Sequence, residues 1–547
     1  MILSSPGIAS LPRNAAGQAA DGRPRQWAPR AARLAAALAG LVAIGAYLLV
    51  ALRRLDYPFA LEQLEGNSLV EVHRILAGQA LYPAPSVGYV PDGYPPLYFY
   101  VSAAVARVFG ASYLTLRLVS LASSLACFAL LARLVQRETG SIAAGTGAAG
   151  VFAATYFAAG DWFDIGRVDS LFLALSIGAL YAVRWMRATP GAIAAGTLLA
   201  AAALTKQTGL AELVVVPAVA LLGPRRGLAR VTALSAVTVL GLSTLMLRLT
   251  SGGWYTYYVF KQMSGQSLTA SNFGWFWTAL ATAMGLAACS ALIGARRVPR
   301  ELLAGCAALA VEGYATLVHS GGAINDVLPA YLAVALLAGL ALGNGAGQSS
   351  TGQSSTGQSS AGQSSTGQSS TGRLVATVAG VLILAQTVFL LASSHPSSAL
   401  PASAGRAVGM RLVAGMRALG GDVAAPGDPS LSLQAGMTTV AVQGAVYDVV
   451  RATDQAGTAS YLHSAAAAVK AWQFSAIISS GNGKALYNPP GLLTYYQECL
   501  QALPAGPAAL LFPAGRNQPV PAVVWIPRGG SCQHVLSILN GGKAAGS

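Results

Sequence analysis

Charged side chains are scarce in this sequence of 547 residues. Only 10% are Asp, Glu, Lys or Arg, whereas an ordinary soluble domain carries about 25%, and this scarcity excludes a soluble globular enzyme. Hydrophobic residues reach 54%. Apolar runs of about 17 to 22 residues recur between positions 34 and 391, and each is long enough to cross about 30 Å of hydrocarbon. The sequence therefore predicts a polytopic membrane protein.

Acidic residues are fewer than basic ones: 19 Asp and Glu stand against 34 Lys and Arg, a net charge of +15. A nucleic-acid partner would need a basic face with base-reading or stacking groups, and the sequence supplies none. The arginines instead form short clusters between apolar runs, the pattern of cytoplasmic loops in membrane proteins. We therefore expect the N-terminus and four later turns on the cytoplasmic side, marked by Arg13, Arg23, Arg25, Arg30 and Arg33; Arg133 and Arg137; Arg184 and Arg187; Arg225, Arg226 and Arg230; and Arg296, Arg297 and Arg300.

Motifs for nucleotide hydrolysis and metal chemistry are also missing. The chain has no Gly-rich phosphate loop, no array of Cys and His at ligand spacing and no nucleophile elbow, which argues against ATP-driven transport. No cofactor follows from the sequence, no metal site is predicted, and a requirement for a divalent metal stays open. Of only five cysteines, Cys499 and Cys532 alone lie in the C-terminal tail, where an oxidising compartment would allow them to form a disulfide.

The apolar runs divide the chain into a basic cytoplasmic N-terminus (1–33), a transmembrane domain (34–392) and an extracytoplasmic C-terminal domain (393–547). We expect an all-α polytopic membrane protein with about eleven or twelve transmembrane helices and a small C-terminal α/β domain. Residues 94–110 are interpreted as a short or re-entrant helix, because a full span there would invert every later loop. Residues 53–93 form the first extracytoplasmic loop. The Gly-Gln-Ser-Ser-Thr repeat at 347–371 is too polar to fold, so we interpret it as a flexible cytoplasmic linker.

Two acids in the first extracytoplasmic loop are candidates for catalysis. Glu62 and Glu65 are three residues apart, so on a helix they share one face. Two carboxylates near a membrane surface can supply a general base and a helper. From the spacing alone, the solvated face of an amphipathic helix is the commoner explanation.

A second group of charges opens a later apolar run, with Asp161, Asp164, Arg167 and Asp169 in close succession. Charges at the mouth of a membrane helix are costly unless they are paired or face water. A functional role is therefore the first hypothesis, and a structural clamp between Arg167 and Asp169 is the alternative. Lys206 stands between two apolar runs and could hold a phosphate as a point charge or reach to lipid headgroups.

Further residues of the outside loops could line a substrate site. The run that begins at Tyr94 is rich in aromatic side chains, which form belts at membrane interfaces or stack on sugar rings. His319 lies in the last short outside loop, and it lacks partners at the spacing of a metal site. Asp164, Tyr94 and His319 are our candidates for substrate-lining residues.

The order of several short motifs resembles a known superfamily. The chain contains, in succession, Glu62-Gln-Leu-Glu65-Gly, Leu76-Ala-Gly-Gln-Ala-Leu-Tyr82, Tyr94-Pro-Pro-Leu-Tyr-Phe-Tyr100, Phe109-Gly, Leu116-Arg117-Leu-Val-Ser, Gly166-Arg167-Val-Asp169-Ser-Leu and Leu204-Thr-Lys206. In this order they resemble the GT-C superfamily of membrane glycosyltransferases, closest to the family 39-like branch that includes protein mannosyltransferases and lipid A aminoarabinose transferases. The resemblance covers residues 34–391 and leaves the C-terminal tail unmatched.

The resemblance implies transfer of a sugar from a polyprenyl-phosphate donor to an acceptor hydroxyl on the extracytoplasmic face, usually with inversion at the anomeric carbon. It implies a carboxylate base, Glu65 or Glu62, with Asp169 as a further catalytic candidate. Arg167 and Lys206 would bind the donor phosphate. The family usually has adjacent Asp-Glu where this sequence reads Leu64-Glu65, so the choice of base stays open. The architecture indicates a multi-pass protein of the bacterial cytoplasmic (inner) membrane.

Two other interpretations stay open. A transporter or flippase of lipid-linked sugars would carry charges in mid-membrane within broken helices, whereas the acids here gather at the outer ends of apolar runs. A GT-C relative that has lost catalysis is the second, because of Leu64. The expected partners are membrane lipid, a polyprenyl-phosphate sugar and an acceptor (protein, lipid or glycan) whose identity the sequence does not give.

Overall fold

The computed structural model describes residues 24–294, 298–344, 370–452, 455–480, 485–499 and 521–541. Most of the expected basic N-terminus, Arg296 and Arg297 therefore lie outside the described residues. So does the repeat at 347–371, except for its last two residues, which open helix α15 (Ser370–Ser393).

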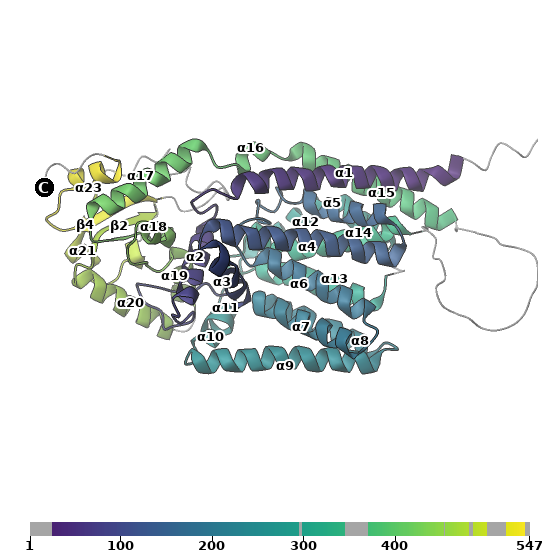
Figure 1. The fold of residues 1–547 in the computed structure, drawn as a ribbon, viewed down its shortest axis with the longest axis horizontal. Coiled ribbons are helices and arrows are strands. Elements are labelled where there is room, and N and C mark those ends of the chain that lie inside the picture. The colour runs from purple at the N-terminus through teal and green to yellow at the C-terminus, as the bar shows by residue number, and fades with distance from the viewer. Residues whose placement is uncertain are drawn as a thin grey trace, which may run out of the picture.

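A bundle of apolar helices makes up most of the molecule (Figure 1). Because hydrocarbon offers no hydrogen-bond partners, an apolar run in a membrane satisfies its backbone internally as a helix. Within the described ranges, six helices are long and apolar enough to cross a membrane, namely α1, α4, α9, α12, α14 together with η4 (Ile324–Val327) before it, and α15. The helices α3, α5, α7 and α8 are shorter and also apolar. The bundle consists of α1 (Pro24–Arg54), α4 (Tyr113–Thr139), α5 (Ile142–Ala154), α6 (Asp169–Trp185), α7 (Thr189–Thr205), α8 (Leu210–Leu221), α9 (Arg226–Thr250), α12 (Ala270–Gly294), α13 (Arg300–Leu317), α14 (Leu328–Gly343) and α15 (Ser370–Ser393).

Small residues let the central helices approach closely. Gly40 in α1 lies against Gly150 in α5, where an added Cβ on Gly150 would come within 2.0 Å of the Gly40 Cα. Close backbone approach of this kind is how helices associate where lipid removes the hydrophobic driving force. The buried α5 thus packs between α1 and α4.

The basic clusters gather at one end of the bundle. Arg33 donates to the carbonyl of Leu342 (2.9 Å), so the start of α1 lies beside the end of α14. Arg184, near the end of α6, pairs with Glu138 of α4 (2.8 Å), and Arg225 donates to the carbonyl of Arg184 (3.2 Å). The described clusters therefore share the end from which the 347–371 segment leaves, as the distribution of arginines predicts.

The first loop lies at the opposite end of the bundle. Its helix α2 (Gln63–Leu76) packs against α3 (Leu97–Phe109), the helix that follows the loop, beside the C-terminal domain (Figure 1). α3 has 13 residues, or about 20 Å at 1.5 Å per residue, which is less than the roughly 30 Å of a hydrocarbon core. The segment 94–110 thus contains a short helix, as expected.

The C-terminal domain is a small α/β unit, which together with the helical bundle confirms the predicted fold class. Its four-stranded sheet has the order β1-β2-β4-β3; β1 runs parallel to β2, and the other two pairs are antiparallel. A disulfide joins Cys499 to Cys532, the pairing that the tail cysteines allow. The elements are α16 (Pro396–Ala399), α17 (Ser403–Leu419), β1 (Asp422–Ala424), α18 (Pro429–Gln434), α19 (Gln443–Arg451), α20 (Gln455–Lys470), β2 (Phe474–Ser480), α21 (Leu492–Tyr495), β3 (Tyr496–Cys499), β4 (Pro521–Pro527) and α23 (Cys532–Leu539).

This domain is docked onto the first loop by hydrogen bonds. Gln434 donates to the carbonyl of Pro58 (3.0 Å), and Ser460 donates to the carbonyl of Pro85 (2.9 Å). The amide of Ala441 donates to the carbonyl of Val87 (2.9 Å). The domain and the loop therefore build one end of the molecule together.

Candidate functional site

A cavity of about 1100 Å³ lies where the bundle, the first loop and the C-terminal domain meet. One wall is the short helical segment α10 (Trp254–Thr256), η2 (Tyr257–Lys261) and α11 (Gln262–Ser264), in which η2 is a π-helix. The floor is formed between the end of α7 and the start of α8, where Lys206 and η1 (Gln207–Gly209) lie. Among the predicted site residues, Glu62, Tyr94, Arg167, Lys206 and His319 line this cavity.

Glu62 places a carboxylate on the cavity wall. It caps the N-terminus of α2, where its Oε2 accepts from the amide of Leu64 (3.1 Å) and from Nη1 of Arg167 (3.1 Å). Arg167 lies over the rings of Tyr94 (5.4 Å) and Trp162 (5.1 Å), contacts that hold a guanidinium by cation–π attraction. Burial raises the pKa of Glu62 above its usual value, although Arg167 opposes that shift.

Glu65 is one turn away in different surroundings. It is fully buried and accepts from Nε and Nη2 of Arg117 (2.8 and 2.9 Å). The amides of Leu61 and Gly166 (both 2.7 Å) complete its hydrogen bonds. Burial alone would raise the pKa of Glu65, but Arg117 and these amides lower it below its usual value. Glu65 is therefore a buried anion held by four donors, and it does not line the cavity.

Lys206 is held between two carboxylates. Its Nζ lies 2.9 Å from Oδ1 of Asp169 and 3.1 Å from Oδ1 of Asp326, and Asn325 also donates to Oδ1 of Asp169 (3.3 Å). An Arg167–Asp169 clamp, the structural alternative, is therefore not what the fold forms, since Arg167 pairs with Glu62 and Asp169 pairs with Lys206. Lys206 can take this position because the backbone is extended there (φ −140°, ψ 125°) between α7 and α8.

The carboxylate of Asp164 contacts Arg54 and Tyr156 and does not line the cavity. Its Oδ2 lies 3.3 Å from Nε of Arg54, and its Oδ1 accepts from the hydroxyl of Tyr156 (2.8 Å). The residue is buried and is not among those that line the cavity. Asp164 therefore ties the end of α1 to the loop before α6, and sequence spacing could not reveal this pairing because Arg54 lies 110 positions away.

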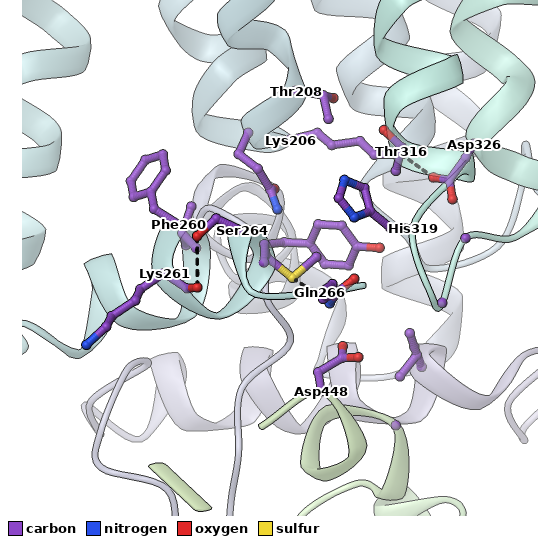
Figure 2. Close-up of a pocket in the computed structure, with 18 of the residues that line it drawn as sticks. Lys206, Thr208, Phe260, Lys261, Ser264, Gln266, Thr316, His319, Asp326 and Asp448 are labelled. Atoms are coloured by element: carbon purple, nitrogen blue, oxygen red, sulfur yellow. Dashed lines mark hydrogen bonds and ion pairs between the residues drawn. The ribbon is translucent and has the colours of Figure 1, made fainter. Parts of the chain in front are cut away.

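The C-terminal domain supplies a wall that the sequence did not indicate. Asp448 and Arg451 of α19 pair with each other and line the cavity, and Arg451 also donates to the hydroxyl of Ser320 (3.2 Å). Figure 2 shows Asp448 on the far side of the cavity from Lys206, with His319 between them. No motif marks α19 in the sequence, because only the folded domain brings it to the bundle.

The described residues contain no group of three or more His, Cys, Asp and Glu side chains that could hold a metal ion. His319 lines the cavity, and its Nδ1 is buried without a hydrogen-bond partner among the described residues. The charged side chains on the cavity wall include Glu62 paired with Arg167, Asp326 paired with Lys206, and Asp448 paired with Arg451.

Comparisons with known proteins identify the fold. No family model and no curated protein matches the sequence. A crystal structure of ArnT from Cupriavidus metallidurans, described as bound to undecaprenyl phosphate, is similar with a TM-score of 0.55 and 13% identity. The similarity covers 89% of this chain and 97% of that one. The same protein in the apo state matches with a TM-score of 0.55, 12% identity and the same coverage. The chain therefore has the GT-C fold that its motifs resemble.

Proposed function

We propose that this protein transfers a sugar from a polyprenyl-phosphate donor to an acceptor hydroxyl, with inversion, on the extracytoplasmic side of the bacterial inner membrane. The observation that carries the proposal is one cavity that holds Glu62 beside Arg167 and Lys206. The cavity lies at the end of the bundle opposite the basic clusters, which favours an extracytoplasmic position. The ArnT structure of the same fold, described as bound to undecaprenyl phosphate, supports a lipid phosphate as the leaving group.

The proposed reaction is a single displacement. The acceptor oxygen attacks the anomeric carbon from the face opposite the phosphate, and the carbon–oxygen bond to the phosphate breaks with its electron pair leaving on the phosphate. Glu62 takes the acceptor proton, and because burial raises its pKa above the usual value, its carboxylate is a stronger base than an exposed one. Arg167 and Lys206 stabilise the negative charge that develops on the leaving phosphate.

The geometry favours Glu62 over Glu65 as the base. A base must reach the acceptor hydroxyl, and Glu62 lines the cavity whereas Glu65 does not. Glu65 and Arg117 instead fix the start of α2 against α4 and the loop before α6. Asp169 and Asp326 position Lys206, so we assign Asp169 to positioning and not to proton transfer. Tyr94 would position Arg167, which donates to its hydroxyl (3.0 Å).

The test is release of free polyprenyl phosphate from a panel of radiolabelled polyprenyl-phosphate sugars by protein in nanodiscs, with crude envelope acceptors. Glu62→Gln should lose release while still binding donor. Glu138→Gln is the matched control, because Glu138 pairs with Arg184 at the far end of the bundle. Donor binding without release from any donor would count against a transferase.

A transporter of lipid-linked sugars is the second candidate. The observation that favours it is a buried acidic pair, Glu212 and Glu312, beside the break between α7 and α8. Transporters place ionisable groups beside discontinuous helices in this way. Movement of intact donor between the leaflets of a proteoliposome, without release of polyprenyl phosphate, would support this candidate.

A further inference from the structure

Three polar side chains meet inside the bundle with unsatisfied oxygen atoms. Glu212 of α8, Glu312 of α13 and Ser176 of α6 are buried, with exposed fractions of 0%, 2% and 0%. Ser176 lies beside Glu212, and Glu212 lies beside Glu312. Outside this cluster, neither carboxylate nor the Ser176 hydroxyl has a hydrogen-bond partner in the described part of the chain. Five buried oxygens thus converge from three helices.

The cluster lies just beneath the floor of the cavity. Thr208 and Thr316 line the cavity; Glu212 follows the first by four residues, and Glu312 precedes the second by four. Four residues make about one helical turn, or roughly 5.4 Å. The Thr208 hydroxyl is itself buried without a partner among the described residues. The acidic pair therefore lies about one helical turn from two residues that line the cavity.

The two acids lie side by side without an ion-pair partner in the part of the chain that the structure describes. Among the described residues, no Lys, Arg or His forms an ion pair with either carboxylate. The nearby cation, Lys206, is bound to both Asp169 and Asp326. Carboxylates side by side in a water-poor interior are strongly unfavourable unless something neutralises them, and ionisable groups inside a membrane bundle mark functional sites by default.

We propose that Glu212, Glu312 and Ser176 form a binding site for a hard divalent cation of the Ca²⁺ or Mg²⁺ class. Carboxylate and hydroxyl oxygens are the ligands that such ions take, and two carboxylates match the charge of one divalent ion. Common transition-metal centres use His and Cys ligands instead. Entry from the cavity side would load the site.

The ion should also strengthen binding of the donor phosphate. This consequence rests on the proposed function. Two anions beneath Lys206 repel a phosphate bound above it, and a divalent ion removes that repulsion. The ion and the lipid phosphate should therefore strengthen each other's binding by the same factor, because coupling between two sites is reciprocal.

The experiment measures ion binding without any donor. Protein in nanodiscs is stripped with chelator and equilibrated with CaCl₂, MgCl₂ or NaCl at constant ionic strength, and bound metal and Tm are recorded. We expect saturable binding of one divalent ion per chain and a rise in Tm of several degrees that grows with ion concentration. The double variant Glu212→Gln/Glu312→Gln should lose both effects, whereas Glu138→Gln should keep them.

A second variant covers the case in which the double variant does not fold. Ser176→Ala keeps both acids, and it should weaken divalent binding several-fold while the stoichiometry stays at one. Wild type that binds no divalent ion and shows no divalent effect on Tm overturns the proposal, and the acidic pair would then hold a proton. Because no sugar donor is present, this result is independent of whether the protein transfers sugar.

Discussion

Glu62 caps the N-terminus of α2 and Glu65 lies in its first turn, but the surroundings of the two carboxylates differ. Glu62 faces the cavity with one charged partner, Arg167. Glu65 accepts four hydrogen bonds in a fully buried position. Spacing predicts that the two acids are close, but only the fold shows that Arg117 binds Glu65 and that Glu65 does not line the cavity.

Loss of the Glu65 charge should reduce stability. Glu65→Gln leaves the Arg117 guanidinium buried without its anion, and breaking a buried pair costs about 3–5 kcal/mol. Denaturant unfolding in micelles measures this, and Glu65→Gln/Arg117→Met should recover part of the loss, because the two residues are coupled. Wild-type stability combined with abolished release in Glu65→Gln would return the role of base to Glu65.

The pH dependence of release should report Glu62. A base works only when ionised, so activity rises as pH increases through the pKa of Glu62. Because burial raises that pKa, the acid limb of the kcat/KM profile should lie above about 4.3, the ordinary glutamate value. A profile that stays flat down to that value would exclude Glu62 as the base.

At the scale of elements, the sequence predicts the helices well and their pairings poorly. Apolar runs locate α1, α4 or α15 because hydrocarbon forces the backbone of a long apolar segment into a helix. The pairs Arg167–Glu62 and Lys206–Asp326 span 105 and 120 positions, and no local pattern encodes them. For the same reason the sequence predicts Asp164 as a substrate-lining residue, whereas in the fold Asp164 pairs with Arg54.

The contact between α1 and α5 gives a prediction about helix packing. Gly150→Ala would place a methyl group 2.0 Å from the Gly40 Cα, and overpacking of this kind costs about 1–3 kcal/mol. Thermal unfolding should show a lower Tm. Gly45→Ala, in the same helix as Gly40, meets nothing within 4 Å and should leave Tm unchanged or slightly higher. Equal Tm values for both variants would contradict the close contact.

On the scale of the whole molecule, the two ends of the bundle differ in their charged residues and in the presence of the cavity. Basic side chains gather at one end, and the cavity lies at the other. The C-terminal domain is at the cavity end of the bundle (Figure 1). The sequence predicts this polarity from its arginines. It does not predict that α19 closes the cavity, because Asp448 and Arg451 reach the site only through the docking of a separate domain.

The 347–371 repeat gives a prediction at this scale. It connects α14 to α15 at the end of the bundle far from the cavity, so its length should not affect the reaction. Removing residues 352–366, three of the five repeat units, should leave polyprenyl phosphate release and Tm close to wild type. A large loss of release in a stable protein would show that the repeat does more than connect two helices.

The most direct measurement compares wild type and Glu62→Gln for release of polyprenyl phosphate from its sugar-linked form. Removal of a general base lowers rates by about 100- to 10,000-fold. Glu62→Gln should lose release in that range with donor affinity and Tm preserved, and the wild-type product should have an inverted anomeric configuration. Undiminished release by Glu62→Gln, or a product with retained configuration, would contradict a single displacement with Glu62 as the base.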